Sequence, residues 1–195
     1  MAIQQQTPPV ESLQALEEAA DHLHPAHSAI TDMLNQAHDR PSEHLPHPVY
    51  AVGLDDMASG DGLKKARVIG WRYLAESSGG RNYLIEVHQT PDGFHRFGGV
   101  EKGPLVEAML KVIDEAKLDQ KISSGVYTLA VLAIQALGVF ALWLNANEVD
   151  AEIVVVPPAP RGLQPWPTTY TVEQFEEALR VEAQSKLAYD VSAFV

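Results

Sequence analysis

The most apolar stretch of the chain reads Val126-Tyr-Thr-Leu-Ala-Val-Leu-Ala-Ile-Gln-Ala-Leu-Gly-Val-Phe-Ala-Leu-Trp-Leu144. It lies within a longer segment, residues 122–147, that contains no Asp, Glu, Lys or Arg. A stretch of this length can cross a bilayer as one helix. It can also fold inside a protein, as a strand over 126–134 followed by a helix over 135–145. These alternatives define different classes of protein, so this segment decides the fold.

Three features of the segment favour the buried strand and helix. It begins with Val126, Tyr127 and Thr128, which are residue types that suit strands. The amide of Gln135 falls in the middle, where a bilayer would penalise it. Neither flank carries a cluster of Lys or Arg. We therefore expect a buried core segment and keep a single-pass membrane protein, spanning 126–144, as the weaker alternative.

Composition and charge narrow the class of protein further. The chain has 195 residues, of which 46% are hydrophobic and 21% charged, as in a globular domain. Its formal net charge of −12 argues against binding to nucleic acid. With no cysteine there is no disulfide, no thiol catalysis and no Cys-ligated zinc. The first residues lack the pattern of a signal peptide, and we expect a cytoplasmic protein.

Residues 1–48 form an acidic N-terminal arm. The arm holds seven acidic residues, one basic residue and six of the eight histidines. Its apolar spacing predicts two helices, 10–23 and 25–38, or one helix kinked at Pro25, followed by an extended linker over 38–48. The heptad-like positions are Leu13, Leu16, Ala20, Leu23, His27, Ile30 and Leu34. Such an arm either binds a partner or a second copy, or packs on its own domain.

Residues 49–195 are expected to form an α+β body. A short strand is expected over 49–54, and strand-forming runs separated by short turns predict a three-stranded antiparallel meander over 67–76, 82–90 and 94–97. Amphipathic patterns predict helices over 104–118 and 171–187, the second of which begins with the capping box Thr171-Val-Glu-Gln174. The fold class is therefore α+β, with an antiparallel sheet of four to six strands. Helices 104–118, 135–145 and 171–187 would cover one face.

Histidines and acidic residues suggest two metal sites, each with a simpler interpretation. His22, His24 and His27 beside Asp21 are zinc-ligand types, but Pro25 interrupts their spacing and solvated histidines are the simpler interpretation. The six arm histidines, at 22, 24, 27, 38, 44 and 47, would become charged near pH 6, which gives a pH-responsive arm as a hypothesis. The loop with Asp55, Asp56 and Asp61 is either a divalent-cation site or a solvated turn. We assign no metal and no cofactor.

Two loops could bind other ligands. Residues 98–104, Gly-Gly-Val-Glu-Lys-Gly-Pro, could hold an anion beside Lys102 at a helix start, or could simply connect a strand to a helix. Residues 157–167 contain five prolines with Arg161 and Trp166. This segment should be extended, either as a ligand for an aromatic groove or as a strap that places Trp166 at the edge of the core.

The predicted meander suggests one further site. Glu86, His88, His95 and Arg96 could be neighbours across its second hairpin, as an acid–base group or as ordinary polar residues on an exposed face. None of the common catalytic motifs is present. We therefore expect a non-catalytic interaction protein that associates with itself or another protein through the arm and the exposed sheet face. The alternative is an enzyme or small-ligand binder with a pocket near Trp71, Tyr73, His88 and His95.

Overall fold

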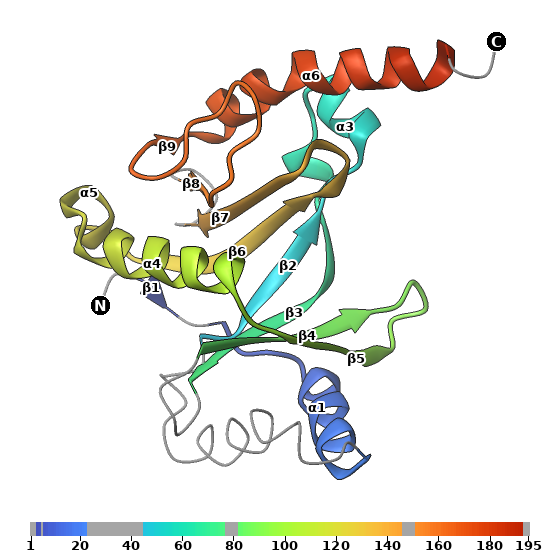
Figure 1. Ribbon diagram of the computed structural model, residues 1–195, viewed down its shortest axis with the longest axis vertical. Coiled ribbons are helices and arrows are strands. Elements are labelled where there is room, and N and C mark those ends of the chain that lie inside the picture. The colour runs from blue at the N-terminus through green and yellow to red at the C-terminus, as the bar shows by residue number, and fades with distance from the viewer. Residues whose placement is uncertain (1–2, 5, 23–44, 77–81, 146–150, 193–195) are drawn as a thin grey trace.

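The computed structural model describes residues 3–4, 6–22, 45–76, 82–145 and 151–192 (Figure 1). The strands are β1 (Ile3–Gln4), β2 (His47–Ala51), β3 (Arg67–Glu76), β4 (Asn82–Gln89), β5 (His95–Glu101), β6 (Tyr127–Ile134), β7 (Val139–Asn145), β8 (Glu152–Val155) and β9 (Thr169–Tyr170). The α-helices are α1 (Val10–His22), α3 (Leu54–Ser59), α4 (Pro104–Leu118), α5 (Gln120–Ser123) and α6 (Val172–Ser192). Short 3-10 turns occupy Leu63–Lys65 and Gln135–Leu137.

The described strands form one sheet in the order β5-β4-β3-β2-β6-β7-β8-β9, with β1 beside β6. Every neighbouring pair is antiparallel except β2–β6 and β1–β6, which are parallel. The α+β class and the β3–β4–β5 meander are thus confirmed. The sheet has nine strands where the sequence indicated four to six. The two-residue strands β1 and β9 are too short to show a pattern, and β7 was expected to be a helix.

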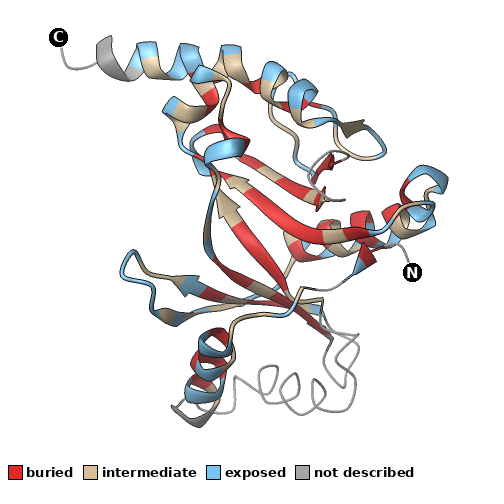
Figure 2. Ribbon diagram, turned by 180° about the vertical axis from the view of Figure 1, so that it is seen from behind, coloured by how far each residue is buried: buried red, intermediate tan, exposed pale blue. Residues whose placement is uncertain are grey.

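The apolar segment 126–144 folds back on itself as the hairpin β6–β7, in which Val131 pairs with Leu142. The helix expected over 135–145 is therefore wrong. Gly138 adopts a left-handed conformation, with φ of 64°, at the turn between the two strands. Both faces of the hairpin are buried, so its sequence lacks the polar alternation that distinguishes a half-exposed strand from a helix (Figure 2). Among the described residues, no helix has the length and apolar character needed to cross a membrane.

Successive residues of the β6–β7 hairpin pack alternately into two hydrophobic cores, one on each face of the sheet. Helices therefore cover both faces of the sheet, whereas the sequence indicated that they would cover only one. Leu129 and Val131 pack in a cluster with Met109 and Ile113 of α4. Residues of opposite parity on β6 pack in a second cluster with the buried face of α6, which confirms the apolar stripe predicted for that helix. The members of this second cluster from β6 and α6 are Leu132, Ile134, Phe175, Leu179 and Ala183.

The N-terminal arm contributes to these cores. β1 pairs with β6, and its Ile3 is buried in the α4 cluster. The helix expected at residues 10–23 is confirmed as α1, whose Leu16 is fully buried against Tyr73 and Ile85. Figure 1 shows α1 beside the β3–β5 end of the sheet, with α6 at the other end of the molecule. The apolar face of α1 therefore packs on its own sheet, and the helix expected over 25–38 lies outside the described residues.

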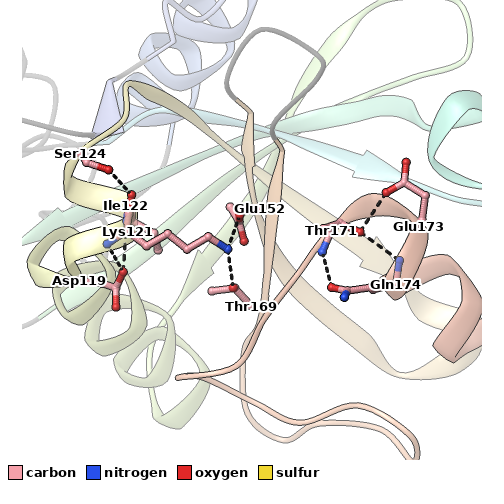
Figure 3. A network of polar contacts seen from close by, with 9 residues as sticks. All are labelled: Asp119, Lys121, Ile122, Ser124, Glu152, Thr169, Thr171, Glu173 and Gln174. Atoms are coloured by element: carbon pink, nitrogen blue, oxygen red, sulfur yellow. Dashed lines mark hydrogen bonds and ion pairs between the residues drawn. The ribbon is translucent and has the colours of Figure 1, made fainter.

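The capping box predicted at the start of α6 is present. The backbone N–H of Gln174 donates to Thr171 Oγ1 at 3.3 Å, and the backbone N–H of Thr171 donates to Gln174 Oε1 at 3.1 Å (Figure 3). These two bonds satisfy donors that the helix itself leaves unpaired. They fix where α6 begins and hence how Phe175 enters the core.

Candidate functional site

A cavity of about 440 Å³ opens on the α4 face of the sheet, beyond the part of that face that the α4 cluster fills. Gly70 on β3 and Ala133 on β6, which carry little or no side chain, both line it. Larger polar and charged residues surround this gap. Those on the cavity face are Arg72, Glu86, His88, Glu101 and Gln135. The cavity is therefore a concave site with convergent polar groups in an otherwise apolar sheet.

An ion pair forms one wall of the cavity. Arg72 on β3 and Glu86 on β4 are cross-strand partners, and both Nε and Nη2 of Arg72 contact Glu86 Oε1. Only 13% of the Arg72 side chain and 15% of the Glu86 side chain are exposed. The guanidinium also lies over the ring of Phe140, 4.6 Å from its centroid. These contacts hold both charged groups in fixed positions.

His88 lies next to this ion pair at the cavity rim. Its Nε2 is 3.6 Å from Glu86 Oε2, so a protonated imidazole would be attracted to the carboxylate. The ring occupies the space above Gly98, where an added Cβ would come within 2.6 Å of it. The absence of a side chain on Gly98 therefore leaves room for the His88 ring in this position.

His47 is buried on β2, directly opposite Arg72 in the β2–β3 ladder. Its Nδ1 is 2.6 Å from the carbonyl oxygen of Leu45, and because a carbonyl only accepts, Nδ1 carries the proton. Burial lowers the pKa of His47 to about 4, and the nearby Arg72 charge acts in the same direction. The hypothesis that all six arm histidines become charged near pH 6 is therefore wrong for His47. The side chains of the other five lie outside the described residues.

The structure brings together only part of the pocket predicted near Trp71, Tyr73, His88 and His95. His88 borders the cavity, and Trp71 also lines it, but the Trp71 side chain is buried in the cluster on α1, on the other face of the sheet from His88. Tyr73 is buried in the cluster on α1, where its hydroxyl lies 2.8 Å from Ser12 Oγ and burial raises its pKa to about 12. His95 pairs with Gln89, so it lies on the opposite face from His88.

The predicted group of Glu86, His88, His95 and Arg96 also divides between the two faces of the sheet. Glu86, His88 and Arg96 share the cavity face, because Arg96 is the cross-strand partner of His88. His95 is on the other face. Arg72, which the sequence analysis did not single out, is instead the charged partner of Glu86. The available signal was Arg72 in the interior of the largely apolar strand β3, whose other charged residues, Arg67 and Glu76, are at its two ends.

The two candidate metal sites have different outcomes. His24 and His27 lie outside the described residues, as does the side chain of His22, so this site stays a hypothesis. In the Asp loop, Asp56 pairs with Lys65 at 3.0 Å and Asp61 pairs with Lys64 at 3.3 Å. The part of the chain that the structure describes contains no group of three or more His, Cys, Asp or Glu residues that could hold a metal ion.

Of the segment 98–104, residues 98–101 belong to β5 and Pro104 begins α4, so only Lys102 and Gly103, the latter at φ of 119°, connect the strand to the helix. Glu101, the last residue of β5, lines the cavity. Glu101 forms no ion pair with another residue in the described ranges.

The proline-rich segment 157–167 is not extended throughout, because it turns at 161–162 and again at 166–167. Hydrogen bonds from Leu163 N to Pro160 O and from Thr168 N to Pro165 O close these turns. Leu163 is buried in the α6 cluster, and Trp166 packs at the edge of the α4 cluster. This placement of Trp166 agrees with the strap interpretation.

A second polar cluster, which the sequence analysis missed, joins α5 to β8 and β9 (Figure 3). Lys121 Nζ lies 2.7 Å from Glu152 Oε1 and 3.5 Å from Thr169 Oγ1. Glu152 is only 8% exposed, so Lys121 neutralises a nearly buried carboxylate. Glu152 belongs to the buried strand β8, and no pattern in the sequence indicates that Lys121 accompanies it.

The fold and the site together define an α+β protein with a charged cavity in a mostly antiparallel sheet. No protein-family model, curated protein or solved structure matches this chain.

Proposed function

We propose that the protein binds a small organic ligand in the cavity between β2, β3, β4, β5 and β6. The observation that carries this proposal is the position of the Arg72–Glu86 ion pair, which is mostly buried yet borders a cavity of about 440 Å³. Binding sites for small molecules commonly combine such a volume with a few fixed polar groups. The apolar contribution comes from Val49 and Ala133, which line the same cavity.

The surroundings of the ion pair support binding by a preformed site. Arg72 is held by Glu86 and by the ring of Phe140. Groups held in this way lose little conformational entropy when a ligand binds. The charged side chains therefore orient a bound ligand, and the small side chains in the lining leave space for it.

A fragment screen on the full chain tests the proposal. Saturation-transfer NMR would be run with neutral, cationic, anionic and zwitterionic fragments on the wild type and on Ala133→Leu. Because the larger side chain fills the cavity without changing its charge, fragments that bind the wild type should be lost in this variant. Ala136→Leu is the matched control, since Ala136 is exposed in the turn before β7 and does not line the cavity.

Two outcomes would contradict the proposal. One is that no fragment of any charge class binds the wild type. The other is that fragments bind Ala133→Leu and Ala136→Leu equally well, which would place them elsewhere. A backbone amide spectrum of each variant shows whether it remains folded, so that loss of binding is not confused with loss of structure.

Association with another protein or a second copy, through the N-terminal arm and the exposed sheet face, is the alternative proposal. The packing of Leu16 under β3–β5 already uses the apolar side of α1, which leaves less apolar surface on this helix for a partner. Light scattering of the full chain during size exclusion tests self-association, and a monomeric mass would contradict it. The cytoplasmic location stays a prediction.

A further inference from the structure

Resting on the proposed ligand-binding function, we propose that the cavity prefers a small organic cation, such as a primary ammonium group on an apolar chain. The charges on the cavity lining favour such a ligand. Two carboxylates, Glu86 and Glu101, face one guanidinium, Arg72. His88 adds a positive charge only when it is protonated.

The two carboxylates lie close together on the same face of the sheet. Glu86 is paired with Gly99 in the β4–β5 ladder, and Glu101 is two residues further along β5. Glu101 is paired with Leu84, which belongs to the α4 cluster, so its side chain is on the cavity face as well. Diagonal neighbours on adjacent strands are within reach of one polar group placed between them.

The guanidinium of Arg72, the permanent positive charge of the cavity lining, is already paired with Glu86. Arg72 directs Nε and Nη2 to Glu86 Oε1, and its Nη1 is buried. An incoming anion would therefore meet a neutralised guanidinium and the charge of Glu101. An incoming cation would meet Glu101, which has no ion-pair partner among the described residues, together with the second oxygen of Glu86. The electrostatic balance therefore favours a cation over an anion of the same shape.

The uncharged residues of the cavity lining indicate what the part of the ligand outside its charged group should be. Val49 and Ala133 supply an apolar surface, and Gln135 supplies an amide at the rim. An alkyl chain with a terminal ammonium group fits both the apolar surface and the carboxylates. The cavity volume limits the ligand to a small molecule.

A matched set of probes separates charge selection from binding itself. Pentylammonium, 1-pentanol and hexanoate share the same alkyl chain and differ in charge. NMR titration of the full chain near neutral pH should give an affinity for pentylammonium about fivefold or more above that for 1-pentanol, with hexanoate weakest. Glu101→Gln should reduce pentylammonium affinity to the level of 1-pentanol and leave 1-pentanol unchanged.

Glu107→Gln is the control for the charge change, because Glu107 is exposed on α4 and does not line the cavity. It should leave all three affinities unchanged. Equal affinities for pentylammonium and 1-pentanol, or tighter binding of hexanoate, would overturn the cation preference while leaving the proposed ligand binding intact. Failure of all three probes would also overturn the cation preference, and the fragment screen with Ala133→Leu would then decide the proposed function separately.

Discussion

His47 and Arg72 lie opposite each other across the β2–β3 ladder, and each has a buried side-chain nitrogen without a hydrogen-bond partner among the described residues. For His47 this atom is Nε2, and for Arg72 it is Nη1. The neutral imidazole and the permanent guanidinium coexist because burial and the guanidinium both disfavour protonation of His47. This pair joins the end of the N-terminal region to the wall of the cavity.

The depressed pKa of His47 predicts a specific loss of stability in acid. Its folded-state pKa of about 4 is below the unfolded value of 6.5, so the unfolded chain binds more protons between these values. The stabilisation is fully present above about pH 6.5 and is lost as the pH falls toward 4. Between about pH 7 and pH 5, His47 should remove about 2 kcal/mol from the free energy of unfolding.

Urea unfolding of the wild type and His47→Gln at both pH values measures this effect. The variant cannot titrate at this position, so its stability should fall by about 2 kcal/mol less than that of the wild type. If both proteins lose the same amount, His47 is not buried in its neutral form.

Removing the guanidinium from the cavity wall should destabilise the fold. In Arg72→Met the Glu86 carboxylate stays mostly buried but loses its guanidinium partner. This change should lower the free energy of unfolding by about 2 kcal/mol, a value that allows for the partial exposure of Glu86. Arg180→Met is the matched control, because the Arg180–Glu177 pair is largely exposed. Arg180→Met should change the free energy of unfolding by no more than about 0.5 kcal/mol. Equal costs in urea unfolding would show that burial of the Arg72–Glu86 pair contributes nothing.

The docking of α1 on the sheet predicts a large effect at Leu16. Because this side chain is fully buried, Leu16→Ala should lower the free energy of unfolding by about 2–5 kcal/mol. Val10→Ala in the same helix should change it by less than about 0.5 kcal/mol, since Val10 is 65% exposed. A Leu16→Ala effect as small as that of Val10→Ala, measured by thermal or urea unfolding, would mean that α1 does not pack on β3–β5.

The capping box at α6 predicts a moderate effect. Thr171→Ala removes the oxygen that accepts a hydrogen bond from the backbone N–H of Gln174. This loss should lower the free energy of unfolding by about 1 kcal/mol. Thr168→Ala, at an exposed position in the preceding turn, provides the comparison and should be nearly neutral. Equal unfolding midpoints for the two variants would contradict a stabilising cap.

The elements that could be predicted from sequence are those whose signals are local. Pro91-Asp-Gly93 marks the turn between β4 and β5, and Thr171 with Gln174 marks the start of α6. The stripe of Met109, Ile113 and Ala116 identifies the buried side of α4. In each of these cases the residues that define the element are neighbours in the chain, so no tertiary information is needed.

The elements that could not be predicted depend on tertiary contacts. Residues 139–145 carry apolar side chains on both faces, and only the two cores on either side explain why they form a strand. The cavity is lined by residues of separate strands, such as Gly70 on β3 and Ala133 on β6, which only the tertiary structure brings together. Glu86 and His88 could be proposed from the strand pattern, but the pairing of Glu86 with Arg72 depends on the β3–β4 register, which the sequence does not specify.

Mapping of bound fragments onto the backbone amides of the full chain tests the central claim most directly. If the cavity is the ligand site, fragments that bind in the screen should shift the amide resonances of residues that line it, such as Gly70, His88 and Ala133. The amides of α6, at the other end of the molecule from α1, should remain unchanged. Shifts centred on α6, or the absence of any saturable shift at the cavity, would contradict the account.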